Sequence, residues 1–371
     1  MLALSASPAS AHPSSDISGI NPELQAIAER QSSNIAAHLP GYSLKRFHLA
    51  AGWATGTVKT AGSLTLDKVN GNESSAGPIC QLPVDKSAVE PLPQETKEEI
   101  IAHEVFHCYE HEIEPAFVGH EGDWIIEGLA RWVDLTLFPN TTFNLALKAL
   151  REYYGRPGES VFDRSYSAVG FWAHASDVLL GQLWQRIPAI LKAGLNFNNR
   201  AAFLAAVSNE ASFLQSWGSS AFDVPFETTN WLMGSPLAGR YYPSGATPQE
   251  VNGTAGFNLV PYSTAQLVLN KRLDKPLVRI YLQPDTHGRF GVQENYLDGE
   301  ITEKLFCSAS NPEECACPKG DTSTLPPTTP LPKDADLGVA AGTGRGQVQI
   351  EYFSPQGSAD CKAPPKPPAG G

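Results

Sequence analysis

Two histidines and a glutamate stand together in the run His103-Glu104-Val105-Phe106-His107, which is an HExxH motif. On a helix, residues four apart lie on one face, so both imidazoles can bind the same metal ion. Glu104 lies beside them, where its carboxylate can take a proton from water on that metal. Apolar residues surround the motif, and polar side chains buried among them need partners, which a metal supplies. The motif therefore predicts a metal centre.

Zinc in a catalytic site takes three protein ligands and leaves one position open for water. In the pattern HExxHxxGxxH the third histidine would fall on Ile113 and the glycine on Glu110, so this pattern is excluded. The apolar segment 124–132 instead offers Glu127, which follows His107 by 20 positions. We expect this segment to form a second helix that carries the glutamate.

The motif, this interval and the Glu-Gly-x-Ala context of Glu127 together resemble the gluzincin clan of zinc peptidases, the thermolysin-like and aminopeptidase-like enzymes. The resemblance covers about residues 95–175. It implies that His103, His107 and Glu127 bind Zn2+. It also implies that Glu104 is the general base, that zinc-bound water attacks a peptide bond, and that Glu104 then passes the proton to the leaving amine.

The same resemblance implies a tyrosine that donates a hydrogen bond to the developing oxyanion, and Tyr166 stands where that downstream tyrosine is expected. An aromatic anchor between helices is an equally good interpretation of Tyr166. His174 is a weaker candidate for the donor. His111 extends the helical row of histidines, but three histidines of one helix would crowd a single ion, so we do not expect it to be a ligand.

One position departs from the resemblance. Many gluzincins have an aspartate four residues after the ligand glutamate, where it orients a ligand histidine, and this chain has Arg131 there. Asp134, one turn later on the same face, is one candidate to replace that aspartate. Asp123 is another.

The elements that must position these residues are mainly helices. A proline-rich lead-in predicts the start of the motif helix, which should run from Gln94 to about Glu112. Glycine, asparagine and serine punctuate a β-like stretch from about Tyr42 to Val84. Periodicity and breakers predict further helices at 21–38, 124–137, 142–155, 165–193, 199–217 and 226–233.

The composition changes near Gly239, beyond which short alternating runs predict a small antiparallel β domain. These runs are 260–263, 265–269, 278–282 and 347–353, with an irregular segment rich in Pro, Thr and Gly at about 311–346. The expected fold class is α+β, with a zincin-like catalytic domain before the β domain. The predicted organisation is a tail at 1–20, the catalytic domain at 21–238, the β domain at 239–362 and a flexible tail at 363–371.

Six cysteines lie outside any CxxC pair, which favours disulfides and an oxidising compartment. Cys108 is expected to pair with Cys80, which precedes the motif helix. The remaining four are expected to staple the β domain: Cys307, Cys315, Cys317 and Cys361. The small-x-small triplet Ala9-Ser10-Ala11 resembles the end of a signal peptide, so we expect a secreted protein; a disordered tail is the alternative.

Charge and hydropathy limit the partners. The formal net charge of −12 argues against a nucleic-acid surface, and no run reaches the roughly 20 apolar residues of a membrane span. The resemblance to zinc peptidases implies a peptide or protein substrate as the partner. A different class of function stays open: a secreted binding protein with a degenerate or structural zinc site, whose β domain recognises a glycan or a protein. An intact Glu104 argues against it, because a structural zinc site has no use for that carboxylate.

Overall fold

The computed structural model describes residues 22–44, 47–51, 63–69, 72–84, 89–116, 122–138, 145–156, 158–207, 209–219, 249–270, 277–290, 295–297, 302–307, 329–330 and 334–353. Residue contacts divide the chain into two units. The first comprises Met1–Tyr153, Val161–Ser208 and Pro225–Ala238, and the second Tyr154–Ser160, Asn209–Val224 and Gly239–Gly371. The domain boundaries expected from the sequence stay predictions.

The first unit contains a small sheet and most of the helices. Its strands are β1 (Phe47–Ala51), β2 (Ser63–Val69) and β3 (Asn72–Val84). Its helices are α1 (Pro22–His38), α3 (Gln94–Ile113), α4 (Asp123–Leu137), most of α5 (Leu145–Gly155), α6 (Val169–Val178), α7 (Leu183–Ala193) and α8 (Asn199–Ala206), with 3-10 turns η1 (Val161–Asp163), η2 (Tyr166–Ala168) and η3 (Leu195–Phe197).

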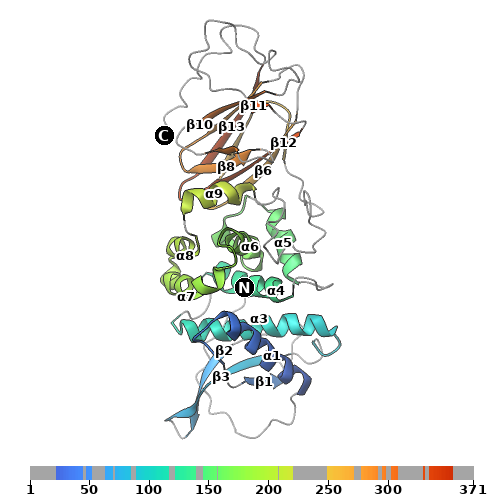
Figure 1. The fold of residues 1–371 in the computed structure, drawn as a ribbon, viewed down its shortest axis with the longest axis vertical. Coiled ribbons are helices and arrows are strands. Elements are labelled where there is room, and N and C mark those ends of the chain that lie inside the picture. The colour runs from blue at the N-terminus through green and yellow to red at the C-terminus, as the bar shows by residue number, and fades with distance from the viewer. Residues whose placement is uncertain are drawn as a thin grey trace. The chain divides into compact units, whose positions relative to one another are not determined.

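Helix α3 occupies the middle of this unit. β3 is the central strand of the sheet, with β1 parallel on one side and β2 antiparallel on the other. α3 contacts β2, β3 and α1, and on its other side it contacts α4 (Figure 1). A disulfide between Cys80 on β3 and Cys108 on α3 ties the sheet to the helix, which confirms the predicted pairing.

Because other elements cover α3 on both sides, its middle part is buried all round. Every residue from Glu99 to Glu110 is buried, including several that are polar or ionisable. The chain enters the helix from Pro93, whose carbonyl accepts the first helical hydrogen bond, from Lys97 N–H, as the proline-rich lead-in predicts. A buried ionisable side chain requires a hydrogen bond or a counter-charge, so α3 needs polar partners on its neighbours.

Aromatic packing fixes α4 against α6. The indoles of Trp124 and Trp172 stack with ring centroids 5.1 Å apart, and Trp172 Nε1–H donates to the backbone oxygen of Trp124 at 2.7 Å. Farther along α4, the Trp132 ring lies 4.9 Å from that of Trp184 on α7. These contacts fix one side of α4, and a neighbouring face of the same helix, which carries Glu127 and Asp134, lies against α3.

Two of the predicted helices are each interrupted. The segment 165–193 forms η2, α6 and α7, because Leu180 and Gly181 both adopt positive φ (51° and 79°) and end α6. The segment 199–217 divides into α8 and α9 (Glu210–Ser219), because Val207 is extended. Periodicity within one window does not register such breaks. The predicted helix at 226–233 lies outside the described residues.

The second unit contains two five-stranded sheets and α9, which packs on β8 and β12. The strand orders are β11-β10-β7-β13-β5 and β4-β6-β12-β8-β9. One shared core of side chains from both sheets joins them, including Val278, Ile280, Leu337, Val339 and Ile350. The strands are β4 (Gln249–Val251), β5 (Ala255–Leu259), β6 (Thr264–Asn270), β7 (Leu277–Leu282), β8 (Thr286–Phe290), β9 (Asn295–Leu297), β10 (Thr302–Cys307), β11 (Thr329–Pro330), β12 (Asp334–Ala341) and β13 (Gly346–Phe353).

This unit differs from the expectation in three details. Its strands are mainly antiparallel, but β4–β6 and β10–β11 are parallel pairs. Residues 260–263 form the connection from β5 to β6 rather than a strand. Within the segment expected to be irregular, residues 334–341 form β12, a central strand. Its alanines and glycine have low β propensity, and its conformation is determined by pairing with β6 and β8. At the level of class, helices with mixed sheets agree with α+β.

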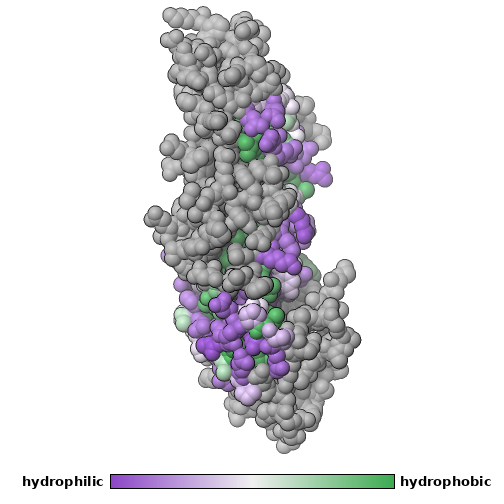
Figure 2. Space-filling model, turned by 90° about the vertical axis from the view of Figure 1, so that its right-hand side faces the viewer, coloured by the Kyte–Doolittle hydropathy of each residue, from purple (hydrophilic) through white to green (hydrophobic). Residues whose placement is uncertain are grey.

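The surface agrees with this division into buried and exposed sides. On the face drawn in Figure 2, the described residues are mostly hydrophilic, with hydrophobic ones scattered between them. Within the described residues, no helix combines the length and apolar character that crossing a membrane requires.

The disulfide predicts a stability effect. Cys80→Ala/Cys108→Ala should lower the free energy of unfolding of the first unit by about 3–4 kcal/mol, because the bond closes a loop with a sequence separation of 28 in the unfolded chain. Guanidinium denaturation followed by tryptophan fluorescence measures this loss. Adding reductant to the double variant controls for the other four cysteines. An unchanged midpoint in the double variant would contradict the prediction.

Candidate metal centre

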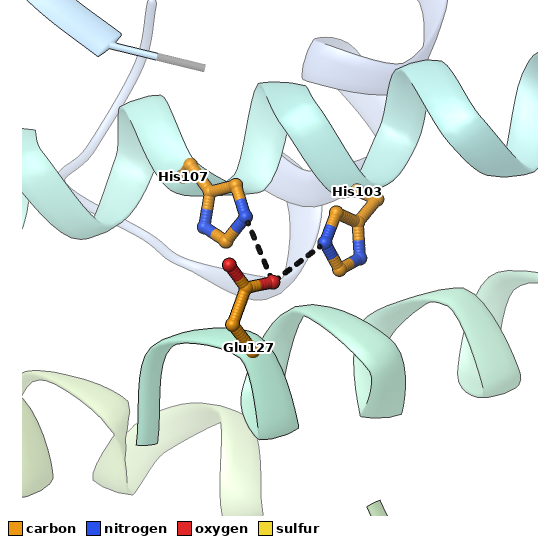
Figure 3. A group of neighbouring side chains, drawn as sticks. All are labelled: His103, His107 and Glu127. Atoms are coloured by element: carbon orange, nitrogen blue, oxygen red, sulfur yellow. Dashed lines mark hydrogen bonds and ion pairs between the residues drawn. The ribbon is translucent and has the colours of Figure 1, made fainter. Parts of the chain in front are cut away.

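Facing sides of α3 and α4 bring the predicted ligands together. His103 and His107 lie one turn apart on α3, and Glu127 points toward them from α4 (Figure 3). Among the described residues, these three form a group of side chains that could hold a metal ion, with their ligand atoms within 4.8 Å of one another. Both histidines are buried, and Glu127 is partly exposed.

Two of the donor separations fit a small cation, while the ligand atoms as a group spread over up to 4.8 Å. Glu127 Oε2 lies 3.2 Å from His103 Nε2 and 3.6 Å from His107 Nε2. Zinc bonds of roughly 2.0–2.1 Å in a tetrahedron place neighbouring donor atoms about 3.3–3.4 Å apart. Two imidazole nitrogens and a carboxylate oxygen are also donors that zinc accepts. The residues present therefore fit a divalent metal of this kind.

The other ring nitrogens are held by carboxylates. His103 Nδ1–H donates to Asp134 Oδ2 at 3.1 Å, and His107 Nδ1–H donates to Glu110 Oε2 at 2.7 Å. A carboxylate only accepts, so each Nδ1 carries a proton in these bonds. Such bonds fix the tautomer and the ring orientation of a ligand histidine. Nε2 of both rings faces the Glu127 carboxylate, where a metal would take the place of a proton.

Of the two aspartates considered from the sequence, Asp134 is the one that contacts a ligand histidine. Glu110, which holds His107, was not predicted from the sequence to have this role. The signal was present: Glu110 follows His107 by one helical turn, where a side chain can reach the same ring. A carboxylate three residues after a motif histidine on the same helix is thus a candidate partner for that histidine's Nδ1–H.

Electrostatics in the group favour an added positive charge. Burial opposes protonation of His107, but the charges of Glu127 and Glu110 outweigh it and raise the pKa of the imidazole well above its usual value. Burial opposes ionisation of Glu127, yet the two histidines hold its pKa far below the usual range. A site that attracts protons onto nitrogens in this way also attracts a metal cation to the same lone pairs.

Two further side chains of the predicted site lie close to the ligands. Glu104 is buried beside His103 on α3. The ring of Tyr166 lies 5.8 Å from that of His103, and its side is open to solvent (39% exposed). Burial, the charges of Glu127 and Glu104, and a hydrogen bond with Glu127 raise the pKa of the Tyr166 hydroxyl, so it keeps its proton at neutral pH. It can therefore donate a hydrogen bond.

Close packing of η2 on α4 brings Tyr166 to this position. At Gly128, next to Glu127, a Cβ atom would lie 2.7 Å from Trp172 Nε1 and 2.8 Å from Ala168 Cβ. Only glycine leaves room at this position for the side chains of Trp172 and Ala168 to approach the α4 backbone this closely. The small residue is thus part of what places the tyrosine beside the ligand glutamate.

A buried carboxylate connects the site to α5. Glu99, one turn before His103, accepts hydrogen bonds from the backbone N–H groups of Leu145 and Ala146 at 2.7 and 3.2 Å, which satisfies two donors at the start of α5. Burial and the charge of Asp134 raise the pKa of Glu99 to about 7. The ionised form of Glu99 is thus destabilised in part by the charge of Asp134, which belongs to the site.

Comparison of the chain with protein-family models, with curated proteins and with solved structures finds no match. The features that indicate a function are therefore the motif and the geometry of the group formed by His103, His107 and Glu127.

The raised pKa of Glu99 predicts a pH-dependent stability. Between its usual pKa of 4.5 and about 7, the folded chain binds more protons at Glu99 than the unfolded chain does, so this group makes stability fall as pH rises through that window. Glu99→Gln should remove the fall and stabilise the protein above pH 7 by on the order of 2–3 kcal/mol. Denaturation from pH 5 to 8 measures it, with the neighbouring Glu98→Gln as the matched control. Equal slopes for wild type and Glu99→Gln would refute the assignment.

The close approach at Gly128 predicts a second effect. Gly128→Ala should destabilise the protein by about 1–3 kcal/mol, because the added methyl overlaps Trp172 and Ala168. Gly155→Ala is the control, since a Cβ at this helical glycine meets nothing within 4 Å. Thermal denaturation of both variants tests the difference, and equal midpoints would show that the helices can separate without loss.

Proposed function

We propose that this chain is a secreted, zinc-dependent peptidase of the gluzincin type with a zincin-like catalytic domain. His103, His107 and Glu127 hold the metal in this proposal, and Glu104 is the general base. The single observation that carries it is the meeting of three such donors from two helices, with both histidines oriented through Nδ1 by carboxylates. The HExxH motif adds a base at the position where hydrolysis needs one.

Zinc in this place supplies Lewis-acid catalysis, because it polarises a carbonyl oxygen and makes water a stronger acid. The chain's own residues supply the rest. Glu104 accepts the proton from the attacking water and passes it to the leaving amine. Because Glu104 follows His103 directly on a buried helix, its carboxylate is held beside the ligands without a flexible loop.

Tyr166 serves as the donor to the oxyanion that forms on the substrate. Its ring borders His103, its hydroxyl stays protonated at neutral pH, and its exposed side allows contact with a substrate. One donor of this kind typically lowers the barrier by roughly 3–4 kcal/mol. The role as a mere aromatic anchor is less well supported, because the side chain is not enclosed.

Export is part of the proposal. The disulfide between Cys80 and Cys108 braces the catalytic helix, and such bonds persist in oxidising compartments. A metal site that depends on the placement of α3 benefits from a covalent link between that helix and the sheet beneath it.

Glu104→Gln tests the proposal. The substitution removes the base and leaves all three ligands, so both proteins should bind about one zinc per chain, while cleavage of a mixed peptide library should fall by at least about 100-fold in the variant. Metal content by plasma emission spectrometry and cleavage products by mass spectrometry provide the two measurements.

His103→Ala is the matched control, which should lose both zinc and cleavage. A wild type without zinc would contradict the whole proposal. A wild type that holds zinc and cleaves no peptide would leave a metal-binding protein and remove the peptidase. Cleavage that survives in Glu104→Gln would assign the base to another group.

A further inference from the structure

Arg131 is the one basic side chain of α4 that faces the candidate metal centre in the described part of the chain, and the proposed function gives it no role. It lies on the same face of the helix as Glu127, one turn before, and Asp134, one turn after. Its side chain is largely buried, with 14% of its surface exposed. Burying a guanidinium is expensive unless it is paired, so its contacts indicate what it does.

The first contact is with Asp134. Arg131 Nη1–H donates to Asp134 Oδ2 at 2.8 Å, and the same oxygen accepts from His103 Nδ1–H at 3.1 Å. The aspartate is fully buried, and its second oxygen, Oδ1, has no hydrogen-bond partner among the described residues. The Asp134 oxygen that accepts a hydrogen bond from His103 is therefore the same atom that accepts one from Arg131.

The second contact is with Tyr166. The guanidinium carbon of Arg131 lies 5.0 Å from the centroid of the tyrosine ring, a cation–π distance. The ring is partly exposed, and Tyr166 is the first residue of a short 3-10 turn, so side-chain contacts contribute to its orientation. The ring also lies 5.8 Å from that of His103.

We propose that Arg131 is a positioning residue that sets two groups of the site at once: through Asp134 it orients the ligand His103, and through its contact with the ring it orients Tyr166. The inference rests on the proposed function for its tyrosine half, because only a reaction uses that hydroxyl. The half that concerns His103 needs only a bound metal. A planar, permanently charged guanidinium suits both contacts, since its N–H groups donate to a carboxylate and its charge is attracted to the face of an aromatic ring.

Two double-mutant cycles test the two halves. In the first, zinc affinity is measured by competition with a chelator for Arg131→Met, Asp134→Asn and the double variant. Arg131→Met should weaken zinc binding about 10-fold, as loss of an outer partner of a ligand does. In the Asp134→Asn background the same change should matter less than about 3-fold, because Arg131 acts through Asp134.

In the second cycle, kcat and KM on a peptide found in the library are measured for Arg131→Met, Tyr166→Phe and the double variant. Arg131→Met should lower kcat about 10-fold with little change in KM, and less than about 3-fold once Tyr166 is phenylalanine. Arg131→Lys keeps the charge and loses the planar fork, so it should recover most of the zinc affinity and little of kcat.

Arg186→Met on α7 is the matched control for removing a part-buried arginine, because Arg186 donates to the Ala205 carbonyl. It should leave zinc affinity and kcat as in the wild type. Additive effects in both cycles, or equal effects of Arg131→Met and Arg186→Met, would overturn the inference while the peptidase stands. A wild type that binds zinc and cleaves nothing would end the proposed function and the tyrosine half, and the zinc cycle would then decide the remaining half by itself.

Discussion

The burial of ionisable side chains on α3 is the constraint on which the site depends. Every position of the helix from Glu99 to Glu110 is buried, and His103 and His107 are among them. Such groups are tolerated in a core only when hydrogen bonds and opposite charges surround them. One face of α4 supplies hydrogen-bond acceptors with negative charge through Glu127 and Asp134. Glu110 of α3 itself supplies the acceptor for His107.

The packing around these helices explains why the charges stay in register. A disulfide fixes α3 to the sheet, and stacked indoles fix α4 to α6. Gly128 removes the side chain that would otherwise separate α4 from the turn carrying Tyr166. The same contacts that bury apolar surface therefore determine the distances between the ligand atoms, and a loss of packing at Gly128 would be felt at Glu127, its neighbour in the chain.

Sharing of single oxygen atoms makes the site a coupled system. Glu127 Oε2 faces both ligand histidines, and Asp134 Oδ2 joins His103 to Arg131. In such an arrangement the effect of one substitution depends on the others, which is why cycles rather than single variants separate the roles. The raised pKa of Glu99 belongs to the same network, since the charge of Asp134 contributes to it.

The sequence by itself determined the helix of the motif and the pairing of its two histidines, because residues four apart share one face of a helix. A family resemblance indicated Glu127 as the third candidate ligand, and the position of Cys80 before the motif helix indicated its pairing with Cys108. Tertiary structure decided which carboxylates orient the histidines, that Arg131 contacts both Asp134 and Tyr166, and that 334–341 is a central strand. These depend on how α4 is rotated against α3 and on which strands pair. No local periodicity contains that information, since burial and partner choice arise only when distant segments meet.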